Sequence, residues 1–314
     1  MLSSVRELLT GAIDYAGLFP PAQLPMPDAV LRFRQHSAGP DGWMLARLVV
    51  PAVRLGELAA LLGEARGPQP PIRLAALARA TELASDLDDI LGFVDRHAGQ
   101  AAVDQLELRL PDDPDQVATA VERSLKAIRA RAPEAVAFFE PSLLGGWPER
   151  LPRSVDALAA AAAGGAVGLK IRCGGLEASA VPSPQALAAA LAACRRAGIP
   201  LKATQGLHQP VRHFDAGLDT TVHGFLNLFF AGVLGHCQGL SEEELLEIVE
   251  EREPAAFRFH DAGLSWRERA AGLDGIAAAR RGAVTSFGSC SFSEPRDALR
   301  TLGLLLEAGE PALS

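Results

Sequence analysis

The fold is decided by residues 167–204, where the short apolar run Val-Gly-Leu-Lys-Ile-Arg (167–172) is separated by an amphipathic segment from a second run, Pro-Leu-Lys-Ala-Thr (200–204). The intervening segment, 184–197, has the length and apolar spacing of a helix, and Ser183 and Pro184 at its start are typical of a helix N-terminus. Strand, helix and strand in this order predict a parallel β-α-β unit.

The same alternation of short apolar runs and amphipathic segments extends along the chain. The predicted strands are 44–50, 72–78, 104–110, 135–140, 167–172, 200–204, 255–260 and 283–288. The predicted helices are 54–66, 83–97, 114–131, 154–163, 184–197, 241–252, 266–281 and 294–308. Eight strand–helix units in a row predict an α/β fold of the (β/α)8 TIM-barrel type. A doubly wound open sheet is the alternative, which the lack of a Gly-rich dinucleotide fingerprint after the first strand disfavours.

Two segments fall outside these eight units. Residues 1–40 are expected to form an N-terminal helical arm with a Pro-rich turn, and residues 206–240 a helical insertion or lid after strand six. We see neither a linker nor an internal repeat, so we expect a single domain over residues 1–314.

The composition excludes several classes of protein. The chain of 314 residues is 48% hydrophobic with a net charge of −8, which excludes a disordered chain and disfavours nucleic acid as a partner. The longest apolar stretch, around 225–234, is too short to span a bilayer, so we expect no membrane partner. Four well-separated cysteines match no zinc or redox motif. We therefore expect a soluble cytoplasmic protein and leave open whether it is a homo-oligomer.

Charged side chains alternate with apolar ones along the predicted strands. Because the apolar members belong against the helices, the charged members are expected to face the barrel interior. The residues expected inside are Glu107, Arg109, Glu140, Lys170, Arg172, Lys202 and Arg258. Cations outnumber carboxylates in this set, which favours a site for a small anionic substrate. An internal lattice of salt bridges is the alternative.

Lysine is rare in this chain, since only Lys126, Lys170 and Lys202 occur among 30 basic residues. Lys170 and Lys202 occupy equivalent positions on adjacent predicted strands, which lie about 4.8 Å apart. Two ammonium groups this close are expected to lower one pKa toward neutrality. A neutral lysine is the nucleophile that forms a Schiff base with a carbonyl compound.

Several short motifs resemble the class I aldolases of the deoxyribose-phosphate aldolase type. Residues 13–18 (Ile-Asp-Tyr-Ala-Gly-Leu) are similar to that family's opening Ile-Asp-His-Thr-x-Leu segment, and Glu107 lies where the family has an Asp on strand three. Residues 170–174 (Lys-Ile-Arg-Cys-Gly) resemble the Schiff-base motif Lys-Thr-x-Thr-Gly. Residues 202–206 (Lys-Ala-Thr-Gln-Gly) resemble the second lysine motif, Lys-Ala-x-Gly-Gly. Residues 288–291 resemble more weakly a Gly-Thr-Ser segment that helps hold phosphate.

The resemblance implies a TIM barrel in which Lys170 forms the imine, Lys202 is the second lysine and Glu107 assists proton transfer. The chain departs from the family pattern at Arg172 and Cys173, which replace small polar residues, and at Gln205, which interrupts the double glycine. A remote relationship is implied, and the family's substrate does not transfer.

Histidines concentrate in and after the 206–240 segment: His208, His213, His223, His236 and, on strand seven, His260. His208 follows strand six directly, and His223 and Asn227 share a helix face at spacing i, i+4. A metal site with Glu107 or Glu140 is conceivable, but no compact metal motif is present, so we assign neither metal nor cofactor.

The sequence thus favours a lyase of the aldolase type that forms a lysine Schiff base with a small anionic carbonyl compound, a sugar phosphate or a keto acid. The predicted catalytic residues are Lys170, Lys202, Glu107 and Glu140. The predicted substrate-binding residues are Arg109, Arg172, Thr204, Gln205, His208, His223, Asn227, Arg258, Gly288 and Ser289. The alternatives are a metal-assisted isomerase or hydrolase that uses the histidines, and a barrel that binds an anionic ligand without turnover.

Overall fold

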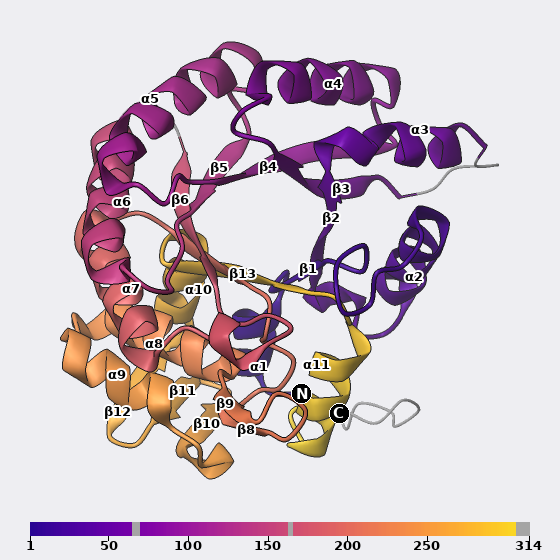
Figure 1. Ribbon diagram of the computed structural model, residues 1–314. Helices are drawn as coiled ribbons and strands as arrows, with labels where there is room; N and C mark the ends of the chain where they lie inside the picture. Colours follow the sequence, from indigo (N-terminus) through magenta and orange to yellow (C-terminus); the bar gives the residue numbers. More distant parts are fainter. Residues whose placement is uncertain (65–69, 163–165, 306–314) are drawn as a thin grey trace.

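Eight parallel strands close into a barrel in the computed structural model, which describes residues 1–64, 70–162 and 166–305 (Figure 1). Around the barrel the strands run in the order β1-β13-β7-β6-β5-β4-β3-β2. Their bounds are β1 Ile13–Tyr15, β2 Leu45–Pro51, β3 Ile72–Ala78, β4 Ala101–Arg109, β5 Val136–Glu140, β6 Val167–Arg172, β7 Leu201–Thr204 and β13 Val284–Ser289. With helices on its outside, the chain has the predicted TIM-barrel fold of the α/β class.

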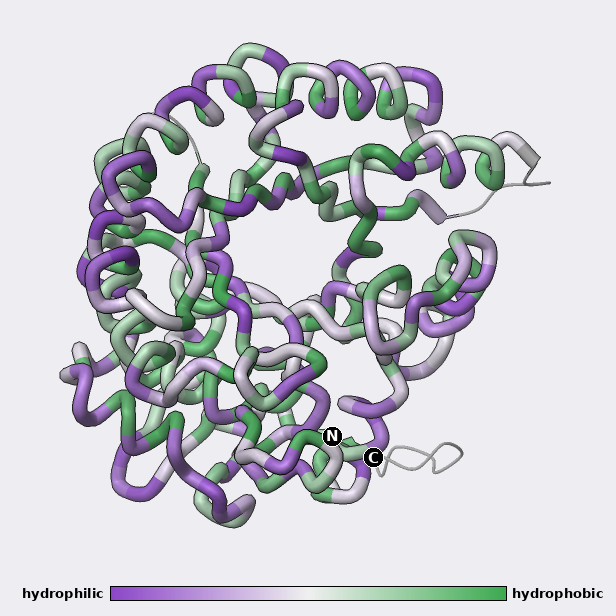
Figure 2. Tube along the Cα trace, viewed as in Figure 1, coloured by the Kyte–Doolittle hydropathy of each residue, from purple (hydrophilic) through white to green (hydrophobic). Residues whose placement is uncertain are grey.

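The helices form a layer around the barrel (Figure 1). Their bounds are α1 Ser3–Leu9, α2 Met26–Ala38, α3 Leu55–Glu64, α4 Leu83–Arg96, α5 Pro114–Arg131, α6 Trp147–Ala162, α7 Pro184–Ala197, α8 Phe225–Gln238, α9 Glu242–Glu250, α10 Leu273–Gly282 and α11 Ser293–Thr301. Short 3-10 turns occupy Gly42–Met44, Ala52–Arg54, Ala178–Ala180 and Pro254–Ala256. Figure 2 shows hydrophilic and hydrophobic residues alternating along these helices, as expected where one helix face covers a barrel. The predicted helix ends at residues 65–66, 163 and 306–308 lie outside the described residues.

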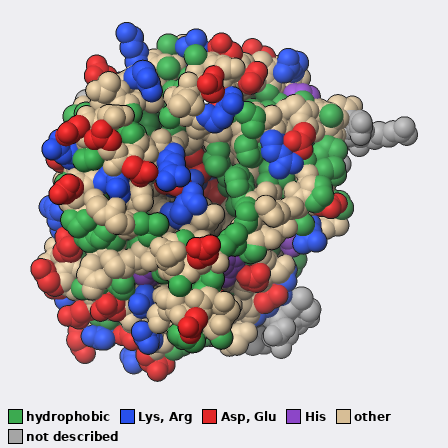
Figure 3. All heavy atoms as spheres, viewed as in Figure 1, with side chains coloured by type: hydrophobic (Ala, Val, Ile, Leu, Met, Phe, Trp, Pro, Cys, Tyr) green, Lys and Arg blue, Asp and Glu red, His purple; other side chains and the backbone are tan. Residues whose placement is uncertain are grey.

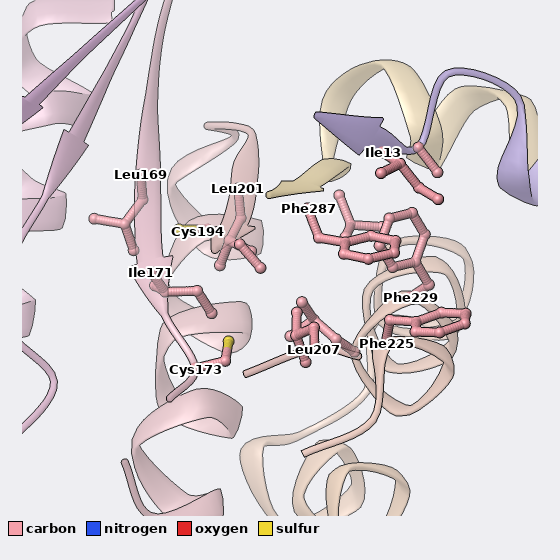
Figure 4. Close-up of a cluster of buried hydrophobic side chains, with 14 of the residues drawn as sticks. Ile13, Leu169, Ile171, Cys173, Cys194, Leu201, Leu207, Phe225, Phe229 and Phe287 are labelled. Atoms are coloured by element: carbon pink, nitrogen blue, oxygen red, sulfur yellow. The ribbon is translucent and has the colours of Figure 1, made fainter. Parts of the chain in front are cut away.

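The core lies between the strands and the helix layer. Leu169 and Ile171 of β6 and Leu201 of β7 are fully buried on the outer face of the barrel (Figure 4). Phe287 of β13 stacks on Phe225 of α8, with ring centroids 5.0 Å apart. The helix α8, from the predicted insertion 206–240, therefore packs on the barrel, and the hairpin of β8 (His213–Asp215) and β9 (Thr220–Val222) precedes it.

The first strand of the barrel differs from the prediction. It is β1, which lies within the expected arm 1–40 and pairs with both β2 and β13. With three residues, of which the central one is Asp14, β1 offers no apolar run for a sequence pattern to detect.

The predicted strand 255–260 is also wrong as a barrel strand. It forms β10 (Phe257–His260) of a separate antiparallel sheet with β11 (Gly263–Trp266) and β12 (Arg269–Gly272). The rings of Phe257 and Phe259 pack against Phe230 of α8, at centroid distances of 5.0 and 5.2 Å. An antiparallel strand with one exposed face shows the same alternation as a barrel strand. The predicted helix 266–281 accordingly contains the end of β11, then β12, and becomes helical only at Leu273.

Candidate active site

Two lysines lie side by side inside the barrel. The register of β6 and β7 places Lys170 directly opposite Lys202, which confirms their predicted adjacency. Their relative exposures are only 5% and 1%. Gly168, two residues before Lys170, leaves room for the ring of Phe138, because a Cβ there would come within 2.4 Å of that ring.

The ammonium group of Lys170 lies between two carboxylates. Its Nζ is 2.6 Å from Glu107 Oε2 and 2.8 Å from Glu140 Oε2. Burial lowers the pKa of Lys170, but the charges of Glu107 and Glu140 outweigh burial and raise that pKa above its usual value. The expectation that Lys202 lowers the pKa of Lys170 toward neutrality is therefore wrong, because the two carboxylates dominate.

Lys202 is held by a second set of acceptors. Its Nζ donates to Asp14 Oδ2 at 2.7 Å, to Gln105 Oε1 at 2.9 Å and to Glu107 Oε1 at 2.5 Å. The ring centroid of Phe138 lies 5.5 Å from the same nitrogen. Three acceptors satisfy the three N–H groups of the ammonium, so Lys202 is a fully bonded buried cation.

Glu107 connects the two lysines, because one of its oxygens accepts from each ammonium group. Burial alone would raise the pKa of Glu107. The charges and hydrogen bonds of Lys170 and Lys202 outweigh it and lower the pKa to about 2. The same kind of pairing, with Lys170 and Arg172, lowers the pKa of Glu140.

The expected excess of cations inside the barrel is not found. Arg172 donates to Glu140 Oε1 from Nη2 at 2.8 Å and from Nε at 3.1 Å. Deeper in the barrel, Arg47 lies 3.5 Å from Asp14 and 2.6 Å from Asp104. Glu140 is a predicted interior residue, but the prediction does not include Asp14, which falls within the expected arm 1–40, or Asp104.

A cavity of about 100 Å³ opens above the lysines at the carboxyl ends of the barrel strands. This is the end at which TIM barrels carry their active sites. Figure 3 shows the corresponding hollow in the space-filling view, with Lys and Arg side chains gathered on its β6 side. The residues around the cavity are Ala16, Phe19, Pro20, Pro21, Val49, Leu77, Glu107, Lys170, Arg172, Gly175, Leu176, Lys202, Thr204, Gln205, Gly206, His208, Gly288 and Cys290.

Among the predicted substrate-binding residues, Arg172, Thr204, Gln205, His208 and Gly288 line this cavity. Arg172 is the most exposed of the three cations there, with 44% of its side chain accessible. Its Nη1 donates to Gln205 Oε1 at 2.9 Å. Gln205 adopts a left-handed backbone conformation, with φ of 57°, which is uncommon for a residue other than glycine.

Two further predicted residues lie near the cavity without lining it. Arg109, at the end of β4, turns outward, with 68% of its side chain exposed and Asp112 at 3.9 Å. Ser289 is 3% exposed, and its hydroxyl donates to the carbonyl of Ser291 at 2.6 Å. The Ser289 hydroxyl therefore donates its proton within the turn after β13 and not to a group in the cavity.

The remaining predicted residues lie elsewhere. His223 Nε2 contacts the carbonyl of Pro182 at 2.8 Å, and burial lowers its pKa to about 4. Asn227 donates to the carbonyls of Ile248 and Glu251, each at 2.8 Å. The expectation that the two share a helix face is wrong, because α8 begins at Phe225 and His223 lies in the segment before it.

Arg258 is wrong as an inward-facing residue, since it lies on the exposed face of β10 together with His260. His213 contacts the carbonyl of Val211 at 3.0 Å, and His208 Nδ1 lies 2.8 Å from Glu294 Oε2. Across residues 1–64, 70–162 and 166–305, no three His, Cys, Asp or Glu side chains gather into a metal site. The histidines therefore do not form the conceivable metal centre within that part of the chain.

Sequence reasoning missed Asp14 and Gln105 as partners of Lys202. Asp14 is fully buried, and Ser286 of β13 donates to the same Oδ2 at 2.6 Å. A signal was present, because Asp14 lies in the segment 13–18 that resembles an aldolase motif. Gln105 shares the strand parity of Glu107, which also pointed to the interior.

Comparisons with known proteins agree with this fold. No protein-family model matches the chain, and no curated protein matches it. The tetrameric deoxyribose phosphate aldolase from Aeropyrum pernix is similar in structure, with a TM-score of 0.52 and 13% identity over 95% of this chain and 93% of that one. The aldolase QR15 is similar too, with a TM-score of 0.50 and 13% identity over 95% and 99% of the two chains. At this identity the likeness shows a shared barrel fold.

Among the described helices, none combines the length and the apolar character that crossing a bilayer requires.

Proposed function

We propose that this protein is an aldolase-like lyase in which Lys170 forms an imine with a small carbonyl compound. The observation that carries the proposal is the position of Lys170, buried at the floor of a cavity and bonded to a carboxylate that a second lysine shares. A buried amine, a proton acceptor at 2.6 Å and an open space above them are the parts that imine formation requires.

The ion pairs of Lys170 with Glu107 and Glu140 are compatible with imine formation, because Glu107 can accept and return the proton that the reaction moves. The Lys170 ammonium passes a proton to Glu107 Oε2, and the free amine attacks the carbonyl carbon, forming the C–N bond. After a proton moves from nitrogen to oxygen, the protonated Glu107 returns its proton to the hydroxyl group, which leaves as water. The net change converts an ammonium and a carbonyl into an iminium and water, and Glu107 is restored.

The charge at Lys170 is the same before and after this step. An iminium between Glu107 and Glu140 meets the same two carboxylates as the ammonium, so the network that raises the pKa of Lys170 also stabilises the iminium. The iminium then accepts the electron pair of a breaking carbon–carbon bond, while one of these carboxylates accepts the proton of the substrate hydroxyl.

Lys202 has a positioning role in this proposal. It holds Glu107 Oε1 at 2.5 Å and is itself anchored by Asp14, so Glu107 Oε2 stays directed toward Lys170. Arg172 is the group that would hold an anionic end of the substrate. Its Nη1 contact with the neutral side chain of Gln205 is one that a carboxylate or phosphate would replace with a stronger bond.

A second candidate, a barrel that binds a ligand without turnover, is favoured by one observation. Lys170, Lys202 and Arg172 each already have carboxylate partners. A closed charge network of this kind also stabilises a binding protein that does no chemistry. The two candidates differ in whether a covalent adduct forms.

Reductive trapping distinguishes them, and the small number of lysines makes the design simple. The intact protein is incubated with acetaldehyde or pyruvate and cyanoborohydride, and its mass is measured for wild type, Lys170→Met and Lys126→Met. Lys126 is exposed on α5 and serves as the matched control. We expect rapid single labelling of wild type and Lys126→Met and its loss in Lys170→Met. Equal labelling of all three proteins would contradict the proposal.

A further inference from the structure

The inside of the barrel mouth is divided into two unlike halves. Strands β4 to β7 carry the charged and polar side chains, among them Glu107, Glu140, Lys170 and Lys202. On the other half, β2, β3 and the loop after β1 carry apolar side chains, which we call the apolar wall: Ala16, Phe19, Val49, Ala75 and Leu77. Asp14 of β1 and Arg47 of β2 also face the interior, but neither borders the cavity. Figure 3 shows the same division, with hydrophobic side chains on the β1–β3 side of the hollow.

The apolar wall is separate from the core beneath the helices. Ala16, Val49 and Ala75 form their own cluster, with relative exposures of 9%, 6% and 0%, and Phe19 and Leu77 pack against it. Val49 follows Arg47 at spacing i, i+2, so it faces the barrel interior, where Arg47 meets Asp14. Four of the five wall residues also border the cavity above Lys170.

These side chains offer no hydrogen-bond partner. A hydroxyl group pressed against the apolar wall would lose its water without replacement, which disfavours binding, whereas a methyl or methylene group there gains contact. The polar groups that border the cavity, among them Arg172, Thr204 and Gln205, come from β6, β7 and the loop after β7. They can bond the carbonyl oxygen or an anionic end of the substrate, but not a hydroxyl that faces the wall.

We propose, resting on the imine chemistry above, that the substrate is a carbonyl compound with a short hydrocarbon group, which packs on the apolar wall while its carbonyl carbon meets Lys170. Between the two expected substrate classes, the wall favours keto acids and aldehydes with an alkyl chain over polyhydroxylated sugar phosphates. The cavity of about 100 Å³ restricts the chain to a few carbons.

The test compares two aldehydes of equal length, propanal and glyceraldehyde. The rate at which each aldehyde is attached to Lys170 is measured with cyanoborohydride as the reductant. The concentrations of the two free aldehydes are made equal and are determined by proton NMR. Each rate is divided by that of Nα-acetyl-lysine, which removes the intrinsic reactivity of the aldehyde. We expect the wild-type protein to prefer propanal by about 10-fold or more, which is the discrimination that one or two apolar contacts provide.

A matched pair of substitutions assigns this preference to the wall. Val49→Thr keeps the shape of the side chain and adds a hydroxyl, and Val53→Thr makes the same change at a position that is 57% exposed. Val49→Thr is expected to lower the preference for propanal by at least about fivefold, and Val53→Thr to leave it unchanged. Labelling with formaldehyde, which is too small to reach the wall, checks that Lys170 stays reactive in both variants.

Three other results would contradict different parts of the proposal. Adducts that form equally well with both aldehydes, or better with glyceraldehyde, overturn the hydrocarbon substrate and leave the imine chemistry standing. The absence of any adduct, formaldehyde included, overturns the imine chemistry and the inference that rests on it. A preference that Val49→Thr does not reduce overturns the role of the wall.

Discussion

Glu107 is the residue on which both lysines depend, because each of its oxygens is bonded to a different ammonium group. In the imine mechanism it is also the group that takes the proton from Lys170 and returns it. Structural and chemical roles therefore meet in one side chain, and its replacement is expected to affect stability and reactivity together.

Glu107→Gln keeps the size of the side chain and removes its charge. We expect the variant to lose about 3 kcal/mol or more of unfolding free energy, because two buried ammonium groups lose a shared carboxylate. We also expect the rate of reductive labelling to fall by at least 100-fold, since an amide cannot accept the proton. Urea unfolding and labelling measure the two effects. Glu122→Gln, at an exposed position of α5, is the control and is expected to change neither.

The pH dependence of labelling distinguishes two versions of the chemistry. The pKa of Glu107 is about 2 and that of Lys170 is raised above its ordinary value, so neither group changes charge between pH 5 and pH 9. If Glu107 takes the proton within the site, the rate of adduct formation is flat over this range after correction for cyanoborohydride reactivity. A rate that rises through an inflection near pH 7 would instead indicate a lysine with a lowered pKa.

Whether a side chain points into the barrel could be predicted from the sequence where the alternation along its own strand was sufficient. The inward positions of Lys170, Lys202 and Glu107 followed from strand parity, and the structure places them there. The direction of the Lys170 pKa shift could not be predicted from its own strand. Its two carboxylate partners come from other strands: Glu107 of β4 lies 63 residues before Lys170, and Glu140 of β5 lies 30 residues before it. Pairing across the barrel depends on closure, which no local pattern contains.

At the level of the strand, β6 depends on a glycine. A Cβ on Gly168 would lie 2.4 Å from the ring of Phe138 and 2.7 Å from the carbonyl of Pro200 on the neighbouring segment. Neither the buried ring nor the backbone can move far, and Phe138 in turn packs on Lys202. Gly168 therefore allows β6, which carries Lys170, to pair with β5, which carries Phe138.

Gly168→Ala is expected to destabilise the protein by about 2 kcal/mol or more, as overpacking in a close-packed interior does. Thermal or urea unfolding measures the effect. The control is Gly56→Ala in α3, where an added Cβ meets no atom within 4 Å and alanine favours the helix. We expect Gly56→Ala to leave stability unchanged or to raise it by up to about 1 kcal/mol. Equal behaviour of the two variants would contradict this account of β6.

Strands could be predicted where the sequence has a clear apolar run. They could not be predicted where the run is too short, or where a barrel strand and an antiparallel surface strand have the same alternation of apolar and charged residues. The runs at β2 to β7 and β13 were identified, whereas β1 was missed because three residues around a buried Asp carry no apolar run. The strand β10 was assigned to the barrel because Phe257 and Phe259 alternate with Arg258 and His260 as an inward-facing strand would. Packing on α8 produces the same alternation.

For the whole molecule, the buried charge network makes stability depend on acid. The pKa of Glu107 falls from 4.5 in the unfolded chain to about 2 in the folded protein, so folding favours its ionised form. This stabilisation is fully present above pH 4.5, amounts to about 3 kcal/mol, and is lost as the pH falls toward 2. The lowered pKa of Glu140 acts in the same direction.

We expect the unfolding free energy of the wild-type protein to be nearly constant from pH 5 to pH 8 and to decline steeply below pH 4.5. The Glu107→Gln variant should start lower and decline less steeply, because one titrating group is gone. Urea unfolding at a series of pH values measures both curves. Parallel curves for the two proteins would mean that Glu107 is not held by the lysines.

The architecture of the whole molecule was the most predictable level, since repeated strand–helix units permit few arrangements. The sequence did not show which eight strands close the barrel. Closure places β1 between distant segments, since Ile13 pairs with Leu45, 32 residues away, and with Phe287, 274 residues away. The charge balance of the site was unpredictable for the same reason, as it needs Asp14 inside.

The central claim is that Lys170 is the reacting amine, and mapping the modified residue tests it most directly. Wild-type protein is labelled with one equivalent of acetaldehyde and cyanoborohydride at pH 7, digested, and sequenced by tandem mass spectrometry. We expect the added ethyl group on Lys170. An ethyl group found mainly on Lys126 or on the N-terminal amine, with Lys170 unmodified, would contradict it.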